Sequence, residues 1–226
     1  VKAGADYITA NTFRTTPRAY ENIGVRRQDA EKRAEESMKI AVENAKEAAG
    51  DSVKVLGSIA PLEDCYSPEM FLGKETAIAE FRQLGGWLVD TGVDILLLET
   101  MNSLAETEAG LIAMQSFESP LWVSFVLKDD THMLSSDKLI DALVLLQNHP
   151  VEMVLLNCNP IQRTENAMTL LAENWTGKWG VYPNLGIGEP SPDGHILNYE
   201  IMSRFLSTMR KIIKLRPSIV GACKII

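Results

Sequence analysis

Two cysteines stand where buried strands are expected to end. Cys158 follows the largely apolar run 151–156, and Cys223 follows a second run, 218–222. The carboxyl ends of parallel strands meet at one edge of a sheet or one mouth of a barrel, and thiolates are common metal ligands. Either cysteine alone is more often a packed apolar residue, but the pair predicts a thiolate metal site.

An acidic residue ends a further apolar strand. Glu99 closes the run 93–98, and burying its charge is costly unless a cation pairs with it. Glu99 is therefore a candidate partner for a positively charged group of a ligand. Residue type alone favours ordinary turn or cap roles for Thr12, Ser58 and Ser124. The polar residues at the other strand ends, which would converge in a barrel, are Asn11, Thr12, Ser58, Thr100, Ser124, Asn157 and Asn184.

The elements that would position these residues alternate between strand and helix. Strands are expected to begin near Tyr7, Val53, Val93, Leu121, Val151, Trp179 and Ser218. Helical periodicity fills the segments between them, and several strands are apolar without alternation, as parallel strands covered by helices are. Seven such units favour an α/β fold of the (β/α)8 TIM-barrel type. We expect one domain over residues 1–226, with the first strand of the barrel upstream of Val1.

Three helices have ends that the sequence predicts. Asp29 is expected to cap a helix that Gly50 ends, with one face formed by Ala30, Ala34, Met38, Ala41, Ala45 and Ala48. Ser103 and Glu106 form a capping box at the start of another helix. A last helix is expected from about Asn198, with an inward face formed by Ile201, Phe205, Met209 and Ile212.

Composition narrows the function classes. The chain has 226 residues, 46% of them hydrophobic, and a formal net charge of −8. This charge argues against a nucleic-acid surface and favours a small-molecule enzyme. Three cysteines form no disulfide framework, and neither a signal peptide nor a membrane span is evident, so a cytoplasmic protein is expected. Further domains or a homo-oligomer are compatible with the sequence.

Several separated motifs resemble those of the homocysteine S-methyltransferases, and they occur in the order found in that family. The family includes the betaine- and S-methylmethionine-dependent enzymes and the homocysteine module of cobalamin-dependent methionine synthase. The resemblance covers nearly the whole chain. The matching segments are residues 4–13, 57–61, 94–100, 156–158, 181–186 and 220–223.

The resemblance implies a chemistry. Glu99 would hold the amino group of homocysteine, and zinc would be held by three cysteine thiolates that include Cys158 and Cys223. The zinc-bound thiolate of homocysteine would attack an activated methyl group of a small donor, giving methionine. Further substrate-binding residues would be Thr12, Ser58 and Asn184.

The sequence departs from the family where a second adjacent cysteine is expected, because Lys224 follows Cys223. A protonated lysine is no zinc ligand. We expect residues to be missing between the two, in a loop whose ordering is coupled to zinc binding. Other candidates for the third ligand are Cys65, His195 and an oxygen of Asn184.

Two alternatives remain open at this stage. A degenerate barrel could bind a small amino acid or a protein partner without catalysis, as Lys224 and the absent first strand suggest. In a different barrel enzyme, the cysteines would be packing residues and Glu99 an acid or base. No motif in the sequence distinguishes betaine, S-methylmethionine and a cobalamin-carried methyl group as donor.

Overall fold

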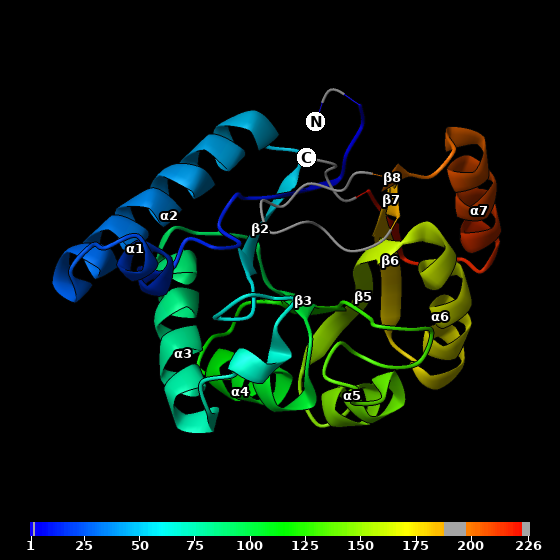
Figure 1. Cartoon of the computed structure of the whole chain (residues 1–226). Coiled ribbons are helices and arrows are strands. Elements are labelled where there is room, and N and C mark those ends of the chain that lie inside the picture. The colour runs from blue at the N-terminus through cyan, green and yellow to red at the C-terminus, as the bar shows by residue number, and fades with distance from the viewer. Residues whose placement is uncertain (2, 188–197, 223–226) are drawn as a thin grey trace.

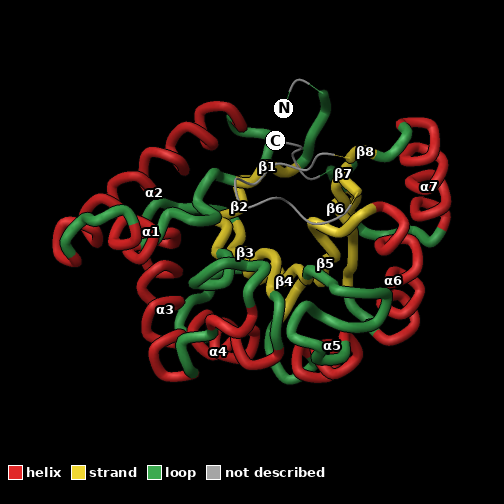
Figure 2. The backbone as a smooth tube through the Cα atoms, viewed as in Figure 1, coloured by secondary structure: helices red, strands yellow, loops and turns green. Residues whose placement is uncertain are grey.

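The chain forms one curved sheet of parallel strands with helices on its outer side (Figures 1 and 2). The computed structural model describes residue 1, residues 3–187 and residues 198–222. Seven strands are hydrogen-bonded in the order β1-β2-β3-β4-β5-β6-β9, and every neighbouring pair is parallel. Among the described residues, no pairing joins β9 to β1. The predicted α/β architecture is confirmed as part of a (β/α)8 barrel.

All seven strands begin within two residues of the predicted positions. The strands are β1 (Tyr7–Thr9), β2 (Lys54–Ile59), β3 (Ile95–Met101), β4 (Leu121–Phe125), β5 (Val151–Pro160), β6 (Lys178–Asn184) and β9 (Ile219–Val220). The helices are α1 (Pro17–Asn22), α2 (Arg27–Ala49), α3 (Lys74–Asp90), α4 (Leu104–Met114), α5 (Leu139–Leu146), α6 (Ile161–Asn174) and α7 (Met202–Lys214), with a short 3-10 helix, η1 (Pro68–Met70).

Alternate residues of each strand face opposite sides of the sheet, and this produces two separate cores. The larger core lies between strands and helices and includes Leu98 of β3 and Phe81 of α3. The smaller core contains strand residues alone, and it fills the inside of the curved sheet. Its members are Leu56, Ile95, Leu97, Trp122, Met153 and Leu155, with Tyr7, Tyr182 and Ile219 packed against them.

One inner position carries glycine because β9 approaches it closely. Gly180 pairs with Ile219, and a Cβ atom at Gly180 would lie only 2.5 Å from the Ile219 carbonyl oxygen. A larger residue would therefore push β9 away from β6.

The ends of α2 only partly match the prediction. Gly50 ends the helix with a φ of 61°, as predicted. The N-cap, however, is Arg26, and Asp29 lies in the first turn. Its carboxylate accepts hydrogen bonds from the Arg26 guanidinium, the shorter at 2.8 Å. An acid in the first turn is favoured by the helix dipole, so Asp29 stabilises the helix without capping it.

The buried face of α2 is rotated relative to the predicted one at its C-terminal end. Ala48 is exposed, whereas Val42 and Ala49 are buried. The predicted face left out Val42 and Ala49, which a 3.6-residue period over a long helix places on the core side.

The predicted capping box of α4 is half formed. The Ser103 hydroxyl accepts a hydrogen bond from the Glu106 N–H at 3.3 Å. The Glu106 carboxylate does not return the bond to Ser103 but accepts one from the Leu62 N–H at 2.8 Å. Glu106 therefore fastens the loop after β2 to the start of α4.

The last helix begins later than predicted. Residues Asn198–Tyr199 form β8, which pairs with β7 (Gly186–Ile187) in an antiparallel hairpin that the sequence did not predict. Phe205 and Ile212 are buried as predicted, but Ile201 precedes the helix and is 71% exposed.

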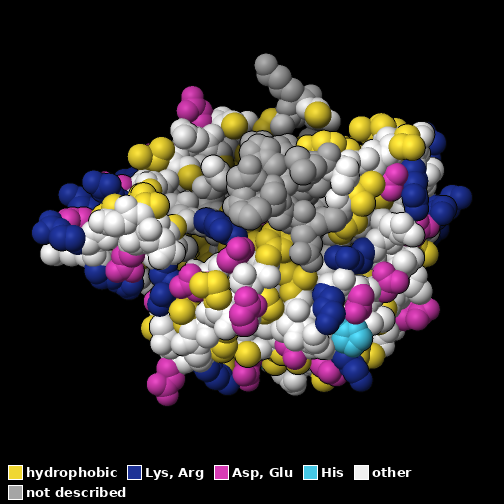
Figure 3. Space-filling model, in the orientation of Figure 1, with side chains coloured by type: hydrophobic (Ala, Val, Ile, Leu, Met, Phe, Trp, Pro, Cys, Tyr) yellow, Lys and Arg dark blue, Asp and Glu magenta, His cyan; other side chains and the backbone are white. Residues whose placement is uncertain are grey.

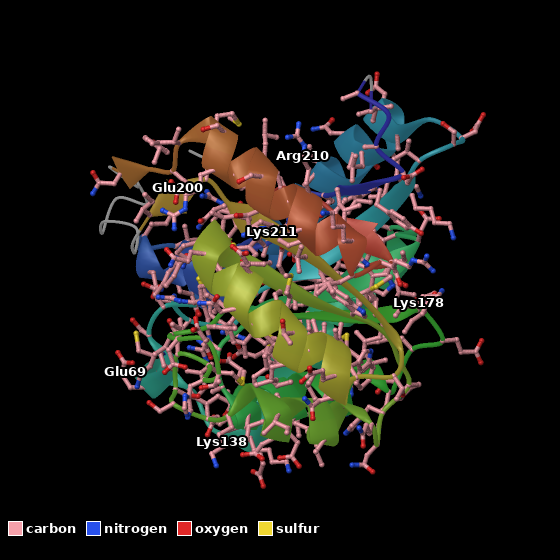
Figure 4. The ribbon with its side chains drawn as sticks, turned by 90° about the vertical axis from the view of Figure 1, so that its right-hand side faces the viewer. Glu69, Lys138, Lys178, Glu200, Arg210 and Lys211 are labelled. Carbon is pink, nitrogen blue, oxygen red and sulfur yellow. The ribbon has the colours of Figure 1, made fainter. Side chains whose placement is uncertain are left out.

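Figure 4 shows the direction of the strands. The view of Figure 1 looks onto their carboxyl ends, and this end faces left in Figure 4. Glu69 of η1 and Glu200 after β8 lie toward the left, whereas Lys178, at the start of β6, lies on the right. Within the described part of the chain, no helix combines the length and apolar character needed to cross a bilayer.

Candidate functional site

The inner face of the sheet changes from apolar to polar at the carboxyl ends of the strands. Each of the polar residues lies two positions after an inward-facing residue of its own strand, so it points to the same side. We call this polar layer the mouth. Its residues are Ser58, Glu99, Ser124, Asn157 and Tyr182. Acidic and basic side chains are interspersed on the surface around this end (Figure 3).

Glu99 is held by two neutral hydroxyl groups from different strands. The Ser58 hydroxyl of β2 donates to Oε2, and the Tyr182 hydroxyl of β6 donates to Oε1 at 3.0 Å. Both carboxylate oxygens are therefore fixed, and their remaining lone pairs are available to a ligand.

In the described part of the chain, no side-chain cation balances the charge of Glu99. No ion pair to its carboxylate exists within the described residues. Burial raises the pKa of Glu99 above the ordinary value for a glutamate, while the bonds from Ser58 and Tyr182 oppose this rise. A cation brought by a ligand would stabilise a half-buried carboxylate in this setting.

Thr12 supports the Glu99 site from the adjacent strand end. Its hydroxyl donates to the Ser58 carbonyl oxygen at 2.8 Å and accepts from the Ser58 N–H at 3.0 Å. Thr12 and Ser58 are both buried. The structure therefore brings together three of the predicted substrate-binding residues, with Thr12 fixing the backbone that carries the Ser58 hydroxyl.

Two strands bulge at the mouth, and each bulge contains a non-glycine residue in the left-handed region. The register of β3 shifts between Leu98 and Met101, where Thr100 has a φ of 61°. The register of β5 shifts between Asn157 and Pro160, where Cys158 has a φ of 53°. Bulges re-aim side chains near functional sites, and such backbone angles persist only where surrounding contacts hold them.

Amide side chains surround Cys158. The Asn157 amide nitrogen lies 3.2 Å from Cys158 Sγ and donates to the Thr100 hydroxyl at 2.6 Å. The Asn184 amide nitrogen donates to the Cys158 carbonyl oxygen at 3.1 Å. Asn184 Oδ1 is buried and has no hydrogen-bond partner among the described residues, so an acceptor beside the cysteine is available to a cation.

The described residues contain no complete metal site. Within them, no three His, Cys, Asp or Glu side chains lie close enough to hold one ion. Cys158 offers a thiol, which is a ligand that suits zinc, and Asn184 Oδ1 offers an adjacent neutral oxygen. The predicted ligand Cys223, its neighbour Lys224 and the candidate His195 lie outside the described residues.

Cys65, a candidate third ligand, has a different partner. Its buried thiol lies 3.6 Å from the Arg14 guanidinium, which also pairs with Asp64 at 2.8 Å. Burial raises the pKa of Cys65, and Arg14 opposes this rise. A guanidinium in contact with the sulfur disfavours a metal cation at the same atom.

Tyr182 is a residue of the mouth that the sequence did not predict, although it lies in the family-like segment 181–186. An aromatic residue in an apolar strand is typical of packing, and Tyr182 also packs against the inner core. The available signal was its position two residues after the inward-facing Gly180 in β6, which places the hydroxyl in the polar layer.

Comparisons with known proteins agree on one family. A model of the homocysteine S-methyltransferase family matches residues 1–224. The chain is 24% identical over 200 residues to homocysteine S-methyltransferase YbgG from Bacillus subtilis, covering 81% of this chain and 64% of the relative. It is 27% identical over 199 residues to the homocysteine S-methyltransferase of Escherichia coli, covering 82% and 64%. The chain thus spans less than two thirds of the length of these relatives.

Solved structures agree on the fold. The metallated form of the homocysteine methyltransferase MmuM from Escherichia coli matches with a TM-score of 0.76 and 22% identity, covering 98% of this chain and 76% of that one. Its oxidised form gives a TM-score of 0.79 at 21% identity, with the same coverage. Dihydrodipicolinate synthase from Aquifex aeolicus matches at 0.53 and 14% identity, covering 99% and 59%. These likenesses support the barrel architecture.

Proposed function

This chain belongs to the homocysteine S-methyltransferase family, and we propose that the protein transfers a methyl group to the thiol of homocysteine, giving methionine. In the reaction, a bond forms between the substrate sulfur and the methyl carbon, and the bond from that carbon to the donor breaks. The thiol proton leaves before the attack. The mouth at the carboxyl ends of the strands would bind the substrate.

The observation that carries this proposal is the Glu99 carboxylate, which two neutral hydroxyls orient and no cation neutralises within the described residues. Homocysteine carries an ammonium group at one end and a thiol at the other. Glu99 would hold the ammonium by a charge-assisted hydrogen bond. Ser58 and Thr12 fix the position of that carboxylate.

The thiol end of the substrate would lie toward Cys158. We propose that Cys158 and Cys223 hold zinc, with the Asn184 oxygen as an additional donor when substrate is absent. Zinc, when bound, lowers the pKa of the substrate thiol, so that a thiolate nucleophile exists at neutral pH. The homocysteine methyltransferase MmuM from Escherichia coli, whose fold this chain shares, has a metallated form, so a protein of this fold can carry a metal.

Different residues of the mouth would therefore bind the two ends of the substrate. Glu99 fixes the ammonium end of the substrate, and the bulge at Cys158 defines the other end. Holding both ends aligns the sulfur with the methyl carbon, and such positioning accounts for a large part of the rate enhancement in reactions of two bound molecules.

A second candidate function rests on the sequence at the last strand, where Lys224 follows Cys223. A chain with two cysteine ligands would bind zinc weakly, and the barrel would then bind an amino acid without methyl transfer.

The experiment that separates these functions is a methyl-transfer assay. The zinc-loaded protein is mixed with L-homocysteine and, in turn, betaine, S-methylmethionine or methylcobalamin, and methionine is measured by mass spectrometry. Methionine formation with one donor, lost in Cys158→Ser, is expected. Homocysteine binding without methionine from any donor would favour the non-catalytic barrel.

A further inference from the structure

We infer that Tyr182 and Ser124 are positioning residues that hold Glu99 for the ammonium group of the substrate. The inference rests on the proposed function and adds to it two residues that would act through Glu99. The three side chains come from three strands, β6, β4 and β3. They meet only because the barrel places the ends of these strands in one layer.

Hydrogen bonds connect Ser124, Tyr182 and Glu99. Ser124 Oγ accepts a hydrogen bond from the Thr100 N–H at 3.0 Å and lies 2.9 Å from the Tyr182 hydroxyl. Tyr182 lies 3.0 Å from Glu99 Oε1. The phenol has one proton and an ionised carboxylate can only accept, so that proton is directed to Glu99. The same hydroxyl lies within hydrogen-bond distance of Ser124 Oγ, so Ser124 of β4 holds the phenol oxygen in place.

These hydrogen bonds orient the Glu99 carboxylate without neutralising its charge. A lysine or arginine in the place of Tyr182 would orient the carboxylate equally well but would occupy it as an ion pair. Tyr182 supplies a donor with no charge, as Ser58 does on the other oxygen. The negative charge therefore remains available to the ligand's cation.

Ser124 also connects the two ends of the mouth. Its partner Thr100 follows Glu99 directly, and the Thr100 hydroxyl accepts from Asn157, which precedes Cys158. A continuous set of hydrogen bonds thus runs from the carboxylate to the residue beside the thiol. The ammonium and thiol of an amino thiol lie a fixed number of bonds apart, so a rigid network of this kind can match the ligand's length.

The test compares two thiols that differ only in the amino group. L-homocysteine and its des-amino analogue, 4-mercaptobutanoate, are titrated into the zinc-loaded protein, and both dissociation constants are measured. Tyr182→Phe should weaken homocysteine binding about three- to tenfold, the effect of one neutral hydrogen bond. The affinity for 4-mercaptobutanoate should stay within about twofold, since that ligand has no ammonium to place.

A matched control removes a phenol hydroxyl elsewhere. Tyr20 forms a hydrogen bond of 2.6 Å to Ser37, between α1 and α2, and Tyr20→Phe should change neither affinity. Ser124→Ala provides a second variant, which should also weaken homocysteine selectively. Equal weakening of both thiols by Tyr182→Phe, or weakening of neither, would overturn the inference.

A double-mutant cycle distinguishes this inference from the proposed function. In a Glu99→Gln background, Tyr182→Phe should have little additional effect on homocysteine, because its action passes through the carboxylate. Additive effects would overturn the positioning role while leaving homocysteine recognition intact. A wild-type protein that bound both thiols equally would overturn ammonium recognition itself, and the inference with it.

Discussion

The hydroxyl of Thr100 lies 3.9 Å from the sulfur of Cys158, and both residues have left-handed backbone angles. Each residue stands at a bulge near the end of its strand, β3 for Thr100 and β5 for Cys158. The two bulges therefore bring these side chains together at the mouth. Because the left-handed region is unfavourable for β-branched and other non-glycine residues, the contacts that hold these angles are part of the site's construction.

The first prediction concerns the strain at Thr100. Thr100→Ala and Thr100→Gly both remove the hydroxyl, but only glycine adopts a φ of 61° without a steric penalty. The glycine variant should be more stable than the alanine variant by about 1 kcal/mol. Urea unfolding of the two variants measures this difference. An alanine variant as stable as the glycine variant would show that the backbone at this position is relaxed.

The second prediction concerns ligand charge at Glu99. Glu99→Gln keeps the size of the side chain and removes the charge, so homocysteine binding should weaken by about 1.5–3 kcal/mol, roughly ten- to over a hundredfold. Zinc content should be unchanged, because Glu99 is not a proposed ligand. Calorimetric titration and metal analysis give the two values. Unchanged homocysteine affinity would assign Glu99 to structure.

The third prediction concerns the pH dependence of stability at Glu106. Burial raises the pKa of this carboxyl, and the Leu62 N–H opposes the rise. Because burial favours the protonated carboxyl, Glu106 contributes fully to stability below the unfolded-state pKa, which is about 4.3 for a glutamate. This contribution is lost as the pH rises through the folded-state pKa. In Glu106→Gln the side chain does not ionise, so this loss of stability should not occur. The amide oxygen should still accept the hydrogen bond from the Leu62 N–H.

Chemical denaturation between about pH 4 and 8 tests this sign. The free energy of unfolding of Glu106→Gln, relative to wild type, should increase as pH rises. Glu108→Gln, on the same helix and half exposed, is the control. A relative stability of Glu106→Gln that stays constant or falls across this range would show that Glu106 does not titrate as inferred.

The fourth prediction concerns the metal. Cys158→Ser should lose most of the zinc found in the wild-type protein by elemental analysis, because serine replaces a thiolate with a weak ligand. Cys65→Ser is the matched control, since Cys65 contacts Arg14, and it should retain the metal. Retention of full zinc by Cys158→Ser would remove Cys158 from the site, and loss in Cys65→Ser would add Cys65 to it.

Several residues of the mouth could be predicted from their positions at the carboxyl ends of the expected strands. The free-energy cost of burying a carboxylate singled out Glu99, and the strand ends placed Ser58 and Ser124 at the same mouth of the barrel. Parallel strands in sequential order place such residues together whatever their separation in sequence. This is why the layer was predictable while its hydrogen bonds were not.

The missed features depend on contacts between distant segments. The partners of Tyr182 are 58 and 83 residues away in the sequence, so no local pattern reveals that its hydroxyl belongs to the site. The left-handed angles at Thr100 and Cys158 are likewise held by neighbouring strands, and residue type alone disfavours them.

The errors in the helices have a local cause. Asp29 is a good N-cap residue by type, but Arg26 precedes the helix and binds its carboxylate from outside. Ile201 fits the apolar period of α7. The strand β8, however, ends at Tyr199, and the helix begins only at Met202. Periodicity identifies the face of a helix more reliably than its first residue.

Proton release on homocysteine binding reports whether the substrate thiol becomes a thiolate at Cys158. Calorimetric titration of L-homocysteine into the zinc-loaded protein near pH 7, in buffers of different ionisation enthalpy, counts this proton. About one proton per bound homocysteine is expected, because the thiol binds as a thiolate, and Cys158→Ser should abolish the release. Binding without proton release, or equal release by Cys158→Ser, would contradict the account.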